Sequence, residues 1–346
     1  MIWLTWRQFR AQALTALAAL AAFAVVLVAT RPHLTSVYAA SGVTACRGDG
    51  CVQVANGFLD RMNGGVYPLV YLLGIAGIVV APALIGVFWG APLIAREFET
   101  GTFRLAWIQS VTRTRWLAGK LALPGLTAVA VTEALSLLYG WWSAPIGQAG
   151  RLATETTFPL ATGPFSLPLF LAHGITPLGY AAFGFVLGVT TGLLLRRIIL
   201  AMAVTLAAFA FIQVVMPLAV RPHLFTPDHT SIAVGSINGP TSIGPATFGF
   251  TVEHLPSRPG SWILSSGAVD ATGQPVTTIP PACREGAADG TRDFPACLTS
   301  QGIRVAVVYQ PTNRYWPIQL IETAVYLALA AAFAAFCFWR LGRRPS

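Results

Sequence analysis

Charged residues are scarce in this sequence of 346 residues. Only 10% of the residues are Asp, Glu, Lys or Arg, whereas 55% are hydrophobic. An ordinary soluble domain contains about 25% charged residues. Because so little charge is available to cover a surface in water, the composition excludes an ordinary soluble protein. It indicates a chain that exposes much of its surface to lipid.

Signatures of soluble enzymes are also missing. The only Gly-Lys pair, Gly119-Lys120, is followed by Leu121, so the chain lacks a phosphate-binding loop for ATP. The sequence contains no His-Glu-x-x-His motif and no Gly-x-Ser-x-Gly motif. We therefore predict no catalytic residues, no metal site and no cofactor bound by this chain.

The net charge of +9 has an uneven distribution along the chain. Basic residues lie at the ends of apolar runs, where they mark the cytoplasmic side of a membrane and meet anionic lipid. No basic stripe carries interleaved aromatic residues. The expected partner of these charges is membrane lipid, and nucleic acid is not expected to bind.

Six apolar segments are long enough to cross the hydrocarbon core of a bilayer, which is about 30 Å thick and takes about 20 residues of helix. They lie at roughly 11–30, 66–90, 121–143, 168–194, 198–220 and 317–339. The predicted fold class is therefore an all-α polytopic membrane protein with six transmembrane helices.

The orientation follows from the basic residues. Six spans place both chain ends on one side of the membrane. Twelve basic residues lie on that side, in the chain ends and the connections, whereas the short loops on the opposite side contain four. Short cytoplasmic loops carry an excess of Lys and Arg. We expect a multi-pass protein of the plasma membrane with both termini in the cytoplasm.

Four of the five cysteines fall in predicted outer loops. Cys46 and Cys51 lie in the first outer loop, and Cys283 and Cys297 lie in the long one. Two pairs on the oxidising side suggest two disulfides. A metal site at Cys46 and Cys51 is the competing interpretation, although no pair of close histidines accompanies them.

The long outer segment differs in composition from the rest of the chain. It is rich in Pro, Gly, Ser and Thr, and the β-prone runs 261–264 and 303–309 punctuate it. We expect a small β-containing extracytoplasmic domain, or an extended cap, closed by Cys283 and Cys297. The predicted division is 1–220 for five transmembrane helices with a cytoplasmic coupling segment at 91–120, 221–316 for the outer domain, and 317–346 for the last helix and cytoplasmic tail.

Glycines recur at helical spacing in two of the spans. Gly184, Gly188 and Gly192 are four residues apart, and Gly86 and Gly90 repeat the pattern. A helix face without side chains lets a neighbouring backbone approach closely. Tight helix packing is expected, either within the chain or between subunits.

The cytoplasmic stretch 95–120 is the only one with acids as well as bases. A solvated cytoplasmic loop with basic membrane anchors would explain the arginines of this stretch. The usual excess of Lys and Arg in cytoplasmic loops does not explain the acids Glu97 and Glu99. Gly101 and Thr102 are suited to end one helical segment and cap the next.

This stretch resembles the permease subunits of type-2 ABC exporters. The similarity lies in Arg-Glu-x-Glu-x-Gly-Thr at 96–102 after the second span and in Gly119-Lys120 entering the third. The run 105–116, Leu-Ala-Trp-x-Gln-Ser-Val-Thr-Arg-Thr-Arg-Trp, is similar to actinobacterial members, as are 309–311, 314–316 and 322–323. The long outer segment before the last span departs from the family.

The resemblance implies a permease that docks a separate ABC ATPase through a short helix, the ATPase binding ATP and Mg²⁺. It also implies a second copy of the chain, or a homologous permease, as a dimer partner. The expected docking residues are Arg96, Glu97, Glu99, Gly101, Thr102 and Arg104.

Glu133 is the acid nearest the middle of a predicted span. An unpaired charge there costs on the order of 3 kcal/mol on insertion scales, so Glu133 should face the bundle interior. It would line a translocation path or form an interhelical hydrogen bond. Two other functions remain open: a sensor or immunity-type membrane protein, and a lipid-linked membrane enzyme, for which Asp228 and His229 are a close pair of candidates.

Overall fold

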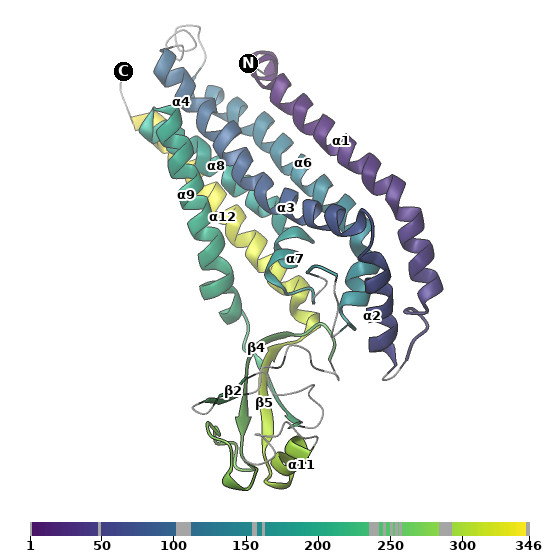
Figure 1. Ribbon diagram of the computed structural model, residues 1–346. Coiled ribbons are helices and arrows are strands. Elements are labelled where there is room, and N and C mark those ends of the chain that lie inside the picture. The colour runs from purple at the N-terminus through teal and green to yellow at the C-terminus, as the bar shows by residue number, and fades with distance from the viewer. Residues whose placement is uncertain are drawn as a thin grey trace.

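The computed structural model describes residues 2–47, 50–101, 112–153, 158–160, 163–234, 242–244, 247–249, 252, 255, 258–283 and 293–343. Six helices in this part are long and apolar enough to cross a membrane. They form one bundle with a small region of β-sheet at one end (Figure 1). The predicted all-α polytopic architecture with a small β part is confirmed.

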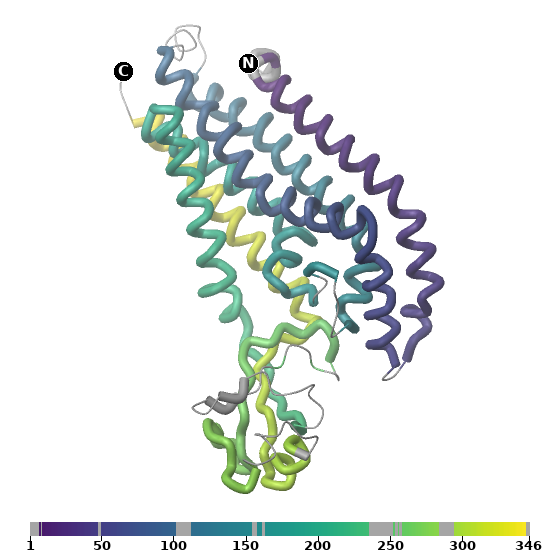
Figure 2. The backbone as a smooth tube through the Cα atoms, in the orientation of Figure 1, coloured from purple at the N-terminus to yellow at the C-terminus, as the bar shows by residue number. Residues whose placement is uncertain are grey.

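Both ends of the chain lie at the end of the bundle opposite the sheet (Figure 1). We call these two ends the terminal end and the sheet end. Helix α1 (Ile2–Ser41) runs between them, and α2 (Cys51–Met62) lies at the sheet end. Helix α3 (Tyr67–Ile85), the π-helical turn η1 (Gly86–Gly90) and α4 (Ala91–Thr100) return to the terminal end as one continuous rod (Figure 2).

The remaining spans complete the bundle. Helix α6 (Arg113–Gly150) runs to the sheet end, where the short α7 (Leu167–Ala172) follows. Helices α8 (Thr176–Leu195) and α9 (Ile198–Val215) form an antiparallel pair, and α9 continues into the π-helical turn η2 (Met216–Val220) and the 3-10 turn η3 (Arg221–His223). The last span is α12 (Tyr315–Arg343).

The sheet region lies between η3 and α12. Its main sheet is antiparallel with the order β1 (Asp228–Ala233), β5 (Arg304–Gln310), β4 (Trp262–Val269). A hairpin of β2 (Ser242–Gly244) and β3 (Thr247–Gly249) accompanies it, with the turns η5 (Pro281–Cys283) and η6 (Thr312–Arg314) and helix α11 (Asp293–Ser300).

The central strand β5 reads Arg-Val-Ala-Val-Val-Tyr-Gln, in which alternate side chains are buried. Val305, Val307 and Tyr309 pack with Phe294 and Leu298 of α11 in a core separate from those of the bundle. The alternation has the period of two that places successive side chains on opposite faces of a strand. The β-prone run 303–309 matches β5 to within one residue at each end, whereas the run 261–264 covers only the start of β4.

Two carbonyl groups that prolines leave free are bonded from α1. Pro92 has no N–H for the Phe88 carbonyl, and the Gln12 side-chain amide lies 3.4 Å from that oxygen. Pro145 likewise leaves the Trp141 carbonyl free, and the Arg31 guanidinium donates to it. Within a bilayer such groups must find partners in the protein, so α1 is fastened to the bundle at both places.

Several helices extend beyond the segments predicted from hydropathy. Helix α1 continues to Ser41 because Leu34 is buried against α2, and α6 continues to Gly150 because Ile146 and Ala149 are buried in the same core. The predicted span 168–194 is divided at 173–175, where Gly174 has φ of +77°. Gln319 of α12 occupies this break, accepting from the Ile175 N–H at 2.9 Å and donating to the His173 carbonyl at 2.9 Å.

Most of the expected coupling segment 91–120 is helical and belongs to the two spans that it was expected to connect. Residues 91–100 are the helical end of one span and residues 113–120 the helical start of the next. Ala91, Ile94 and Ala95 are fully buried in the bundle, which explains why the helix continues. Only residues 101–112 lie between the two helices.

Candidate functional site

The terminal end of α4 carries the two acids singled out by the sequence. Glu97 forms an ion pair with Lys120 of α6, in which the side chains of Lys120 and Glu97 are only 6% and 15% exposed. Lys120 also lies 5.3 Å from the centre of the Trp116 ring. A partly buried ion pair is screened less by salt than a surface pair, so this contact joins α4 firmly to α6.

Glu99 makes a second contact within the chain. Its Oε1 accepts a hydrogen bond of 2.8 Å from the N–H of Ile198, the first residue of α9. A carboxylate is favourable at a helix N-terminus, where backbone N–H groups are unpaired. The Arg196 guanidinium lies 5.1 Å from the centre of the Phe98 ring, so α4 also contacts the turn between α8 and α9.

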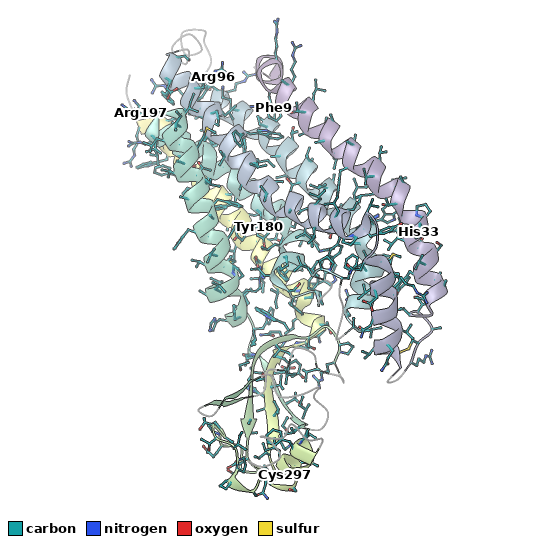
Figure 3. The ribbon with its side chains drawn as sticks, viewed as in Figure 1. Phe9, His33, Arg96, Tyr180, Arg197 and Cys297 are labelled. Carbon is teal, nitrogen blue, oxygen red and sulfur yellow. A yellow bond between two sulfur atoms is a disulfide. The ribbon has the colours of Figure 1, made fainter. Side chains whose placement is uncertain are left out.

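Basic side chains remain exposed around these contacts. Arg96, Arg115, Arg196 and Arg197 are exposed to solvent. Figure 3 shows Arg96 and Arg197 at the terminal end of the bundle. Gly101 ends α4 in the left-handed conformation, with φ of +70°. The predicted docking residues Thr102 and Arg104 lie outside the described residues.

The two glycine sets face each other within the chain. A Cβ atom at Gly188 of α8 would collide with the carbonyl oxygen of Gly86, and one at Gly90 would collide with the carbonyl oxygen of Phe185. At Gly184 and Gly192, a Cβ would lie 2.5 Å from the carbonyl oxygens of Pro82 and Ala91, respectively. The glycines therefore let α8 contact the rod of α3, η1 and α4 backbone to backbone.

Glu133 lies on α6 and is partly buried. Its Oε2 atom is buried and makes no hydrogen bond within the described part of the chain. On the same helix Leu126 and Leu137 are exposed, at 70% and 61%. These two leucines lie seven residues before and four after Glu133, so the acid borders a surface that faces lipid or another subunit.

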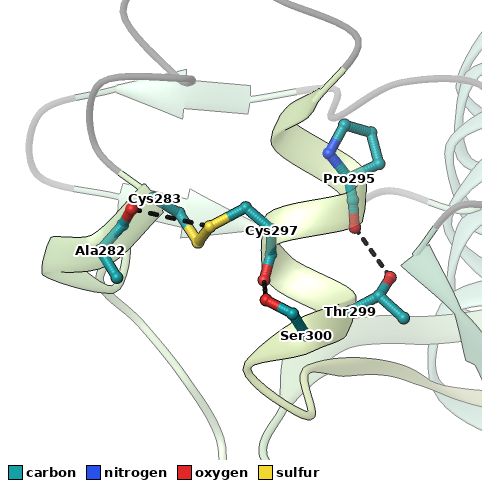
Figure 4. The surroundings of a disulfide bond; sticks show 6 residues. All are labelled: Ala282, Cys283, Pro295, Cys297, Thr299 and Ser300. Atoms are coloured by element: carbon teal, nitrogen blue, oxygen red, sulfur yellow. Dashed lines mark hydrogen bonds between the residues drawn. A yellow bond between two sulfur atoms is a disulfide. The ribbon is translucent and has the colours of Figure 1, made fainter.

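Both cysteine pairs are joined. Cys46, in the connection after α1, forms a disulfide with Cys51, the first residue of α2. Cys283 and Cys297 form the second, which fastens η5 to α11 (Figure 4). Cys337 of α12 is buried, with its sulfur 3.3 Å from the Thr190 hydroxyl. Within the residues that the structure describes, no group of three or more His, Cys, Asp or Glu side chains is placed to hold a metal ion.

A buried ion pair at the sheet end was not expected from the sequence. Arg221 of η3 and Glu322 of α12 have side chains only 2% and 0% exposed. Tyr180 of α8 donates a hydrogen bond of 2.5 Å to Glu322, and the Arg221 guanidinium lies 3.9 Å from the centre of the Phe170 ring. In the sequence, the only indications of this pair are an acid, Glu322, within the last span and an arginine, Arg221, at the end of the fifth.

Asp228 and His229, the candidate pair for a membrane enzyme, do not point toward a common site. Asp228 accepts a hydrogen bond of 2.8 Å from Arg314. His229, the next residue of β1, is exposed. Successive residues of a strand point to opposite faces, so the two side chains cannot act on one substrate atom.

Comparisons with curated proteins and with solved structures give no significant match. A family profile does match, over residues 17–221, which is more than half of the chain and runs from within α1 to the first residue of η3. The matched region contains three of the six candidate spans in full and most of the first and fifth, together with the rod of α3, η1 and α4 and both glycine sets. The chain belongs to the family described as ABC-2 membrane transporter related.

Proposed function

We propose that this chain is the permease subunit of an ATP-driven ABC exporter, in which it forms the translocation path. Family membership supports a permease of the ABC-2 type. Because the sequence has no phosphate-binding loop, ATP and Mg²⁺ would be bound by a separate ATPase subunit. That ATPase docks at the terminal end, on the surface around 95–120.

The observation that carries this proposal is the pair of contacts made by the acids of α4. Glu97 joins α4 to α6, and Glu99 joins α4 to the start of α9. The same rod contacts α8 through the glycines. A force applied to the end of α4 is therefore passed to three other spans, as an ATPase that moves on binding nucleotide requires.

These contacts divide the predicted docking residues by role. Glu97 and Glu99 hold the segment in position, whereas Arg96, Arg115 and Arg197 are exposed and can meet a partner. Exposed cations steer association with an acidic groove and fix its register. Gly101, Thr102 and Arg104 complete the proposed surface.

Co-purification with the ATPase tests the docking surface. The variant R96E/R115E is expected to retain at least tenfold less ATPase, because losing one partner of a hydrogen-bonded charge pair that the interface buries costs roughly 2–5 kcal/mol. The matched control is R343E, a charge reversal at an exposed site in the last turn of α12. Release of the ATPase by R343E but not by R96E/R115E would show that the docking surface is elsewhere.

The orientation and assembly are part of the same proposal. The terminal end lies in the cytoplasm and the sheet end outside, in agreement with the excess of basic residues near the chain ends. The spans of α1 and α9 bury little of their surface within the chain. Their apolar faces are available to lipid and to a second permease copy.

A further inference from the structure

A cavity of about 220 Å³ lies at the sheet end of the bundle. Its wall includes Tyr71 of α3, Ser143 and Arg151 from the end of α6, His173 after α7, and Tyr315 and Trp316 of α12. Gly260, which precedes β4, lies against Arg151 and Pro164, so the sheet region borders the cavity. Nothing in the proposed docking of an ATPase uses this cavity.

The wall carries the positive charge of Arg151, for which the described part of the chain provides no counter-ion. Arg151 forms none of the ion pairs found within the described residues, and no Asp or Glu contributes to the lining. Its charge reaches the cavity, because it adds to burial in lowering the pKa of His173. Arg151 is exposed and lines a recess in the protein surface, and a guanidinium in that position favours an anion, which it can bind through two N–H groups.

The neighbouring polar groups are arranged as donors. The Tyr315 hydroxyl accepts a hydrogen bond of 2.8 Å from Gln319, so its own hydrogen remains available for a ligand. His173 Nδ1 lies 3.0 Å from the Leu169 carbonyl, which can only accept, so Nδ1 carries the proton. Nε2 of the neutral ring then accepts from the Ser143 hydroxyl at 2.9 Å. The ring acceptor of His173 is thus already occupied, while Arg151 and Tyr315 supply donors to the wall.

The size and the aromatic lining point to a ligand that is only partly enclosed. Pockets that enclose a whole small molecule measure about 300–1,000 Å³, more than the 220 Å³ found here. Trp316 is 57% exposed, and Trp and Tyr favour the boundary between lipid and water. A charged headgroup would fit the cavity, while an attached apolar tail would remain beside Trp316 in the lipid.

We propose that this cavity binds the anionic headgroup of a membrane amphiphile, with Arg151 and Tyr315 as its hydrogen-bond donors. The inference goes beyond the exporter function and does not depend on it. Lipid binding to this site is measured on the permease without an ATPase. A negative result there would therefore leave the proposed ATPase docking untouched, and the reverse also holds.

The test uses the purified full-length chain in detergent and native mass spectrometry to titrate bound lipid. The anionic probe is dihexanoyl phosphatidylglycerol, and the zwitterionic probe is dihexanoyl phosphatidylcholine. The anionic lipid is expected to bind more tightly. R151Q should raise its Kd about tenfold, the equivalent of roughly 1.4 kcal/mol. R151K, which keeps the charge, should recover part of the affinity.

R47Q is the matched control, because Arg47 is an exposed arginine in the connection between α1 and α2, away from the cavity lining. Y315F supplies a second test should R151Q fail to fold, since it removes one donor and keeps the ring. Equal binding of both lipids, or unchanged affinity in both R151Q and Y315F, would overturn the proposal. Competition by inorganic phosphate as effective as that of the lipid would overturn the assignment to an amphiphile.

Discussion

The guanidinium group of Arg221 forms two hydrogen bonds with the carboxylate of Glu322, from Nε to Oε2 at 2.8 Å and from Nη2 to Oε1 at 2.9 Å. The two residues are 101 positions apart in the sequence. Arg221 begins the last helical turn of the fifth span, and Glu322 belongs to the sixth. The pair therefore fastens these two spans at the point where the chain leaves the bundle for the sheet region.

Removing one partner of this pair should destabilise the protein strongly. E322A leaves Arg221 buried without a counter-ion, which typically costs about 3–5 kcal/mol of the free energy of unfolding. The double variant R221L/E322L should lose much less, because no unpaired charge remains. Thermal unfolding of the purified variants measures both, and a double variant less stable than E322A would contradict this account of the pair.

The contact between the glycine sets predicts a position-specific effect of a single methyl group. G188A should lower the melting temperature, because the new Cβ would collide with the Gly86 carbonyl oxygen and force the helices apart. The matched control is G77A in α3, where nothing lies within 4 Å of the added atom. Alanine is the better helix former, so G77A should unfold at the same temperature or higher. Equal effects of the two substitutions would show that close packing at Gly188 is not limiting.

The proposed orientation predicts how the cysteines react in intact cells. After reduction, Cys46, Cys51, Cys283 and Cys297 should be labelled from outside by a membrane-impermeant maleimide. Cys337 should stay unlabelled in the folded protein, because its side chain is fully buried. Labelling of the four loop cysteines only in inside-out vesicles would reverse the orientation.

Stability should fall as the pH is lowered through the titration of His173. Burial lowers its pKa below the ordinary value of 6.5, the hydrogen bond to the Leu169 carbonyl acts in the opposite direction, and Arg151 lowers it further. The unfolded chain therefore takes up a proton at a higher pH than the folded chain. The stability contribution is complete above about pH 6.5 and is lost progressively below it.

Thermal unfolding measured between pH 8 and pH 5 checks this expectation. H173Q should show a flatter dependence of the melting temperature on pH, because the titrating group is gone. H229Q removes an exposed histidine of β1 and should leave the dependence as in the unmodified protein. An identical pH dependence in H173Q and the unmodified protein would exclude His173 as its source.

The sequence by itself determined the number of spans, the small β region and the candidate sulfur pairs. Hydropathy is a sum over neighbouring residues, and a run of about 20 apolar residues specifies a membrane helix wherever the rest of the chain lies. The alternating pattern of 304–310 specifies a strand in the same local way. These features depend on what is adjacent in the sequence.

Tertiary structure decided where helices end and which groups meet. Helix α1 passes the predicted boundary because α2 covers Leu34, and the fourth segment breaks at 173–175 because Gln319 bonds the open backbone there. The sequence assigns Glu97 and Glu99 to a docking surface and predicts no contact for them within the chain, yet Lys120 and the start of α9 hold them. A polar group buried in a largely apolar bundle needs a hydrogen-bond or ionic partner on another helix. The packing of segments that are far apart in the sequence decides which residue that partner is. No local sequence pattern therefore encodes it.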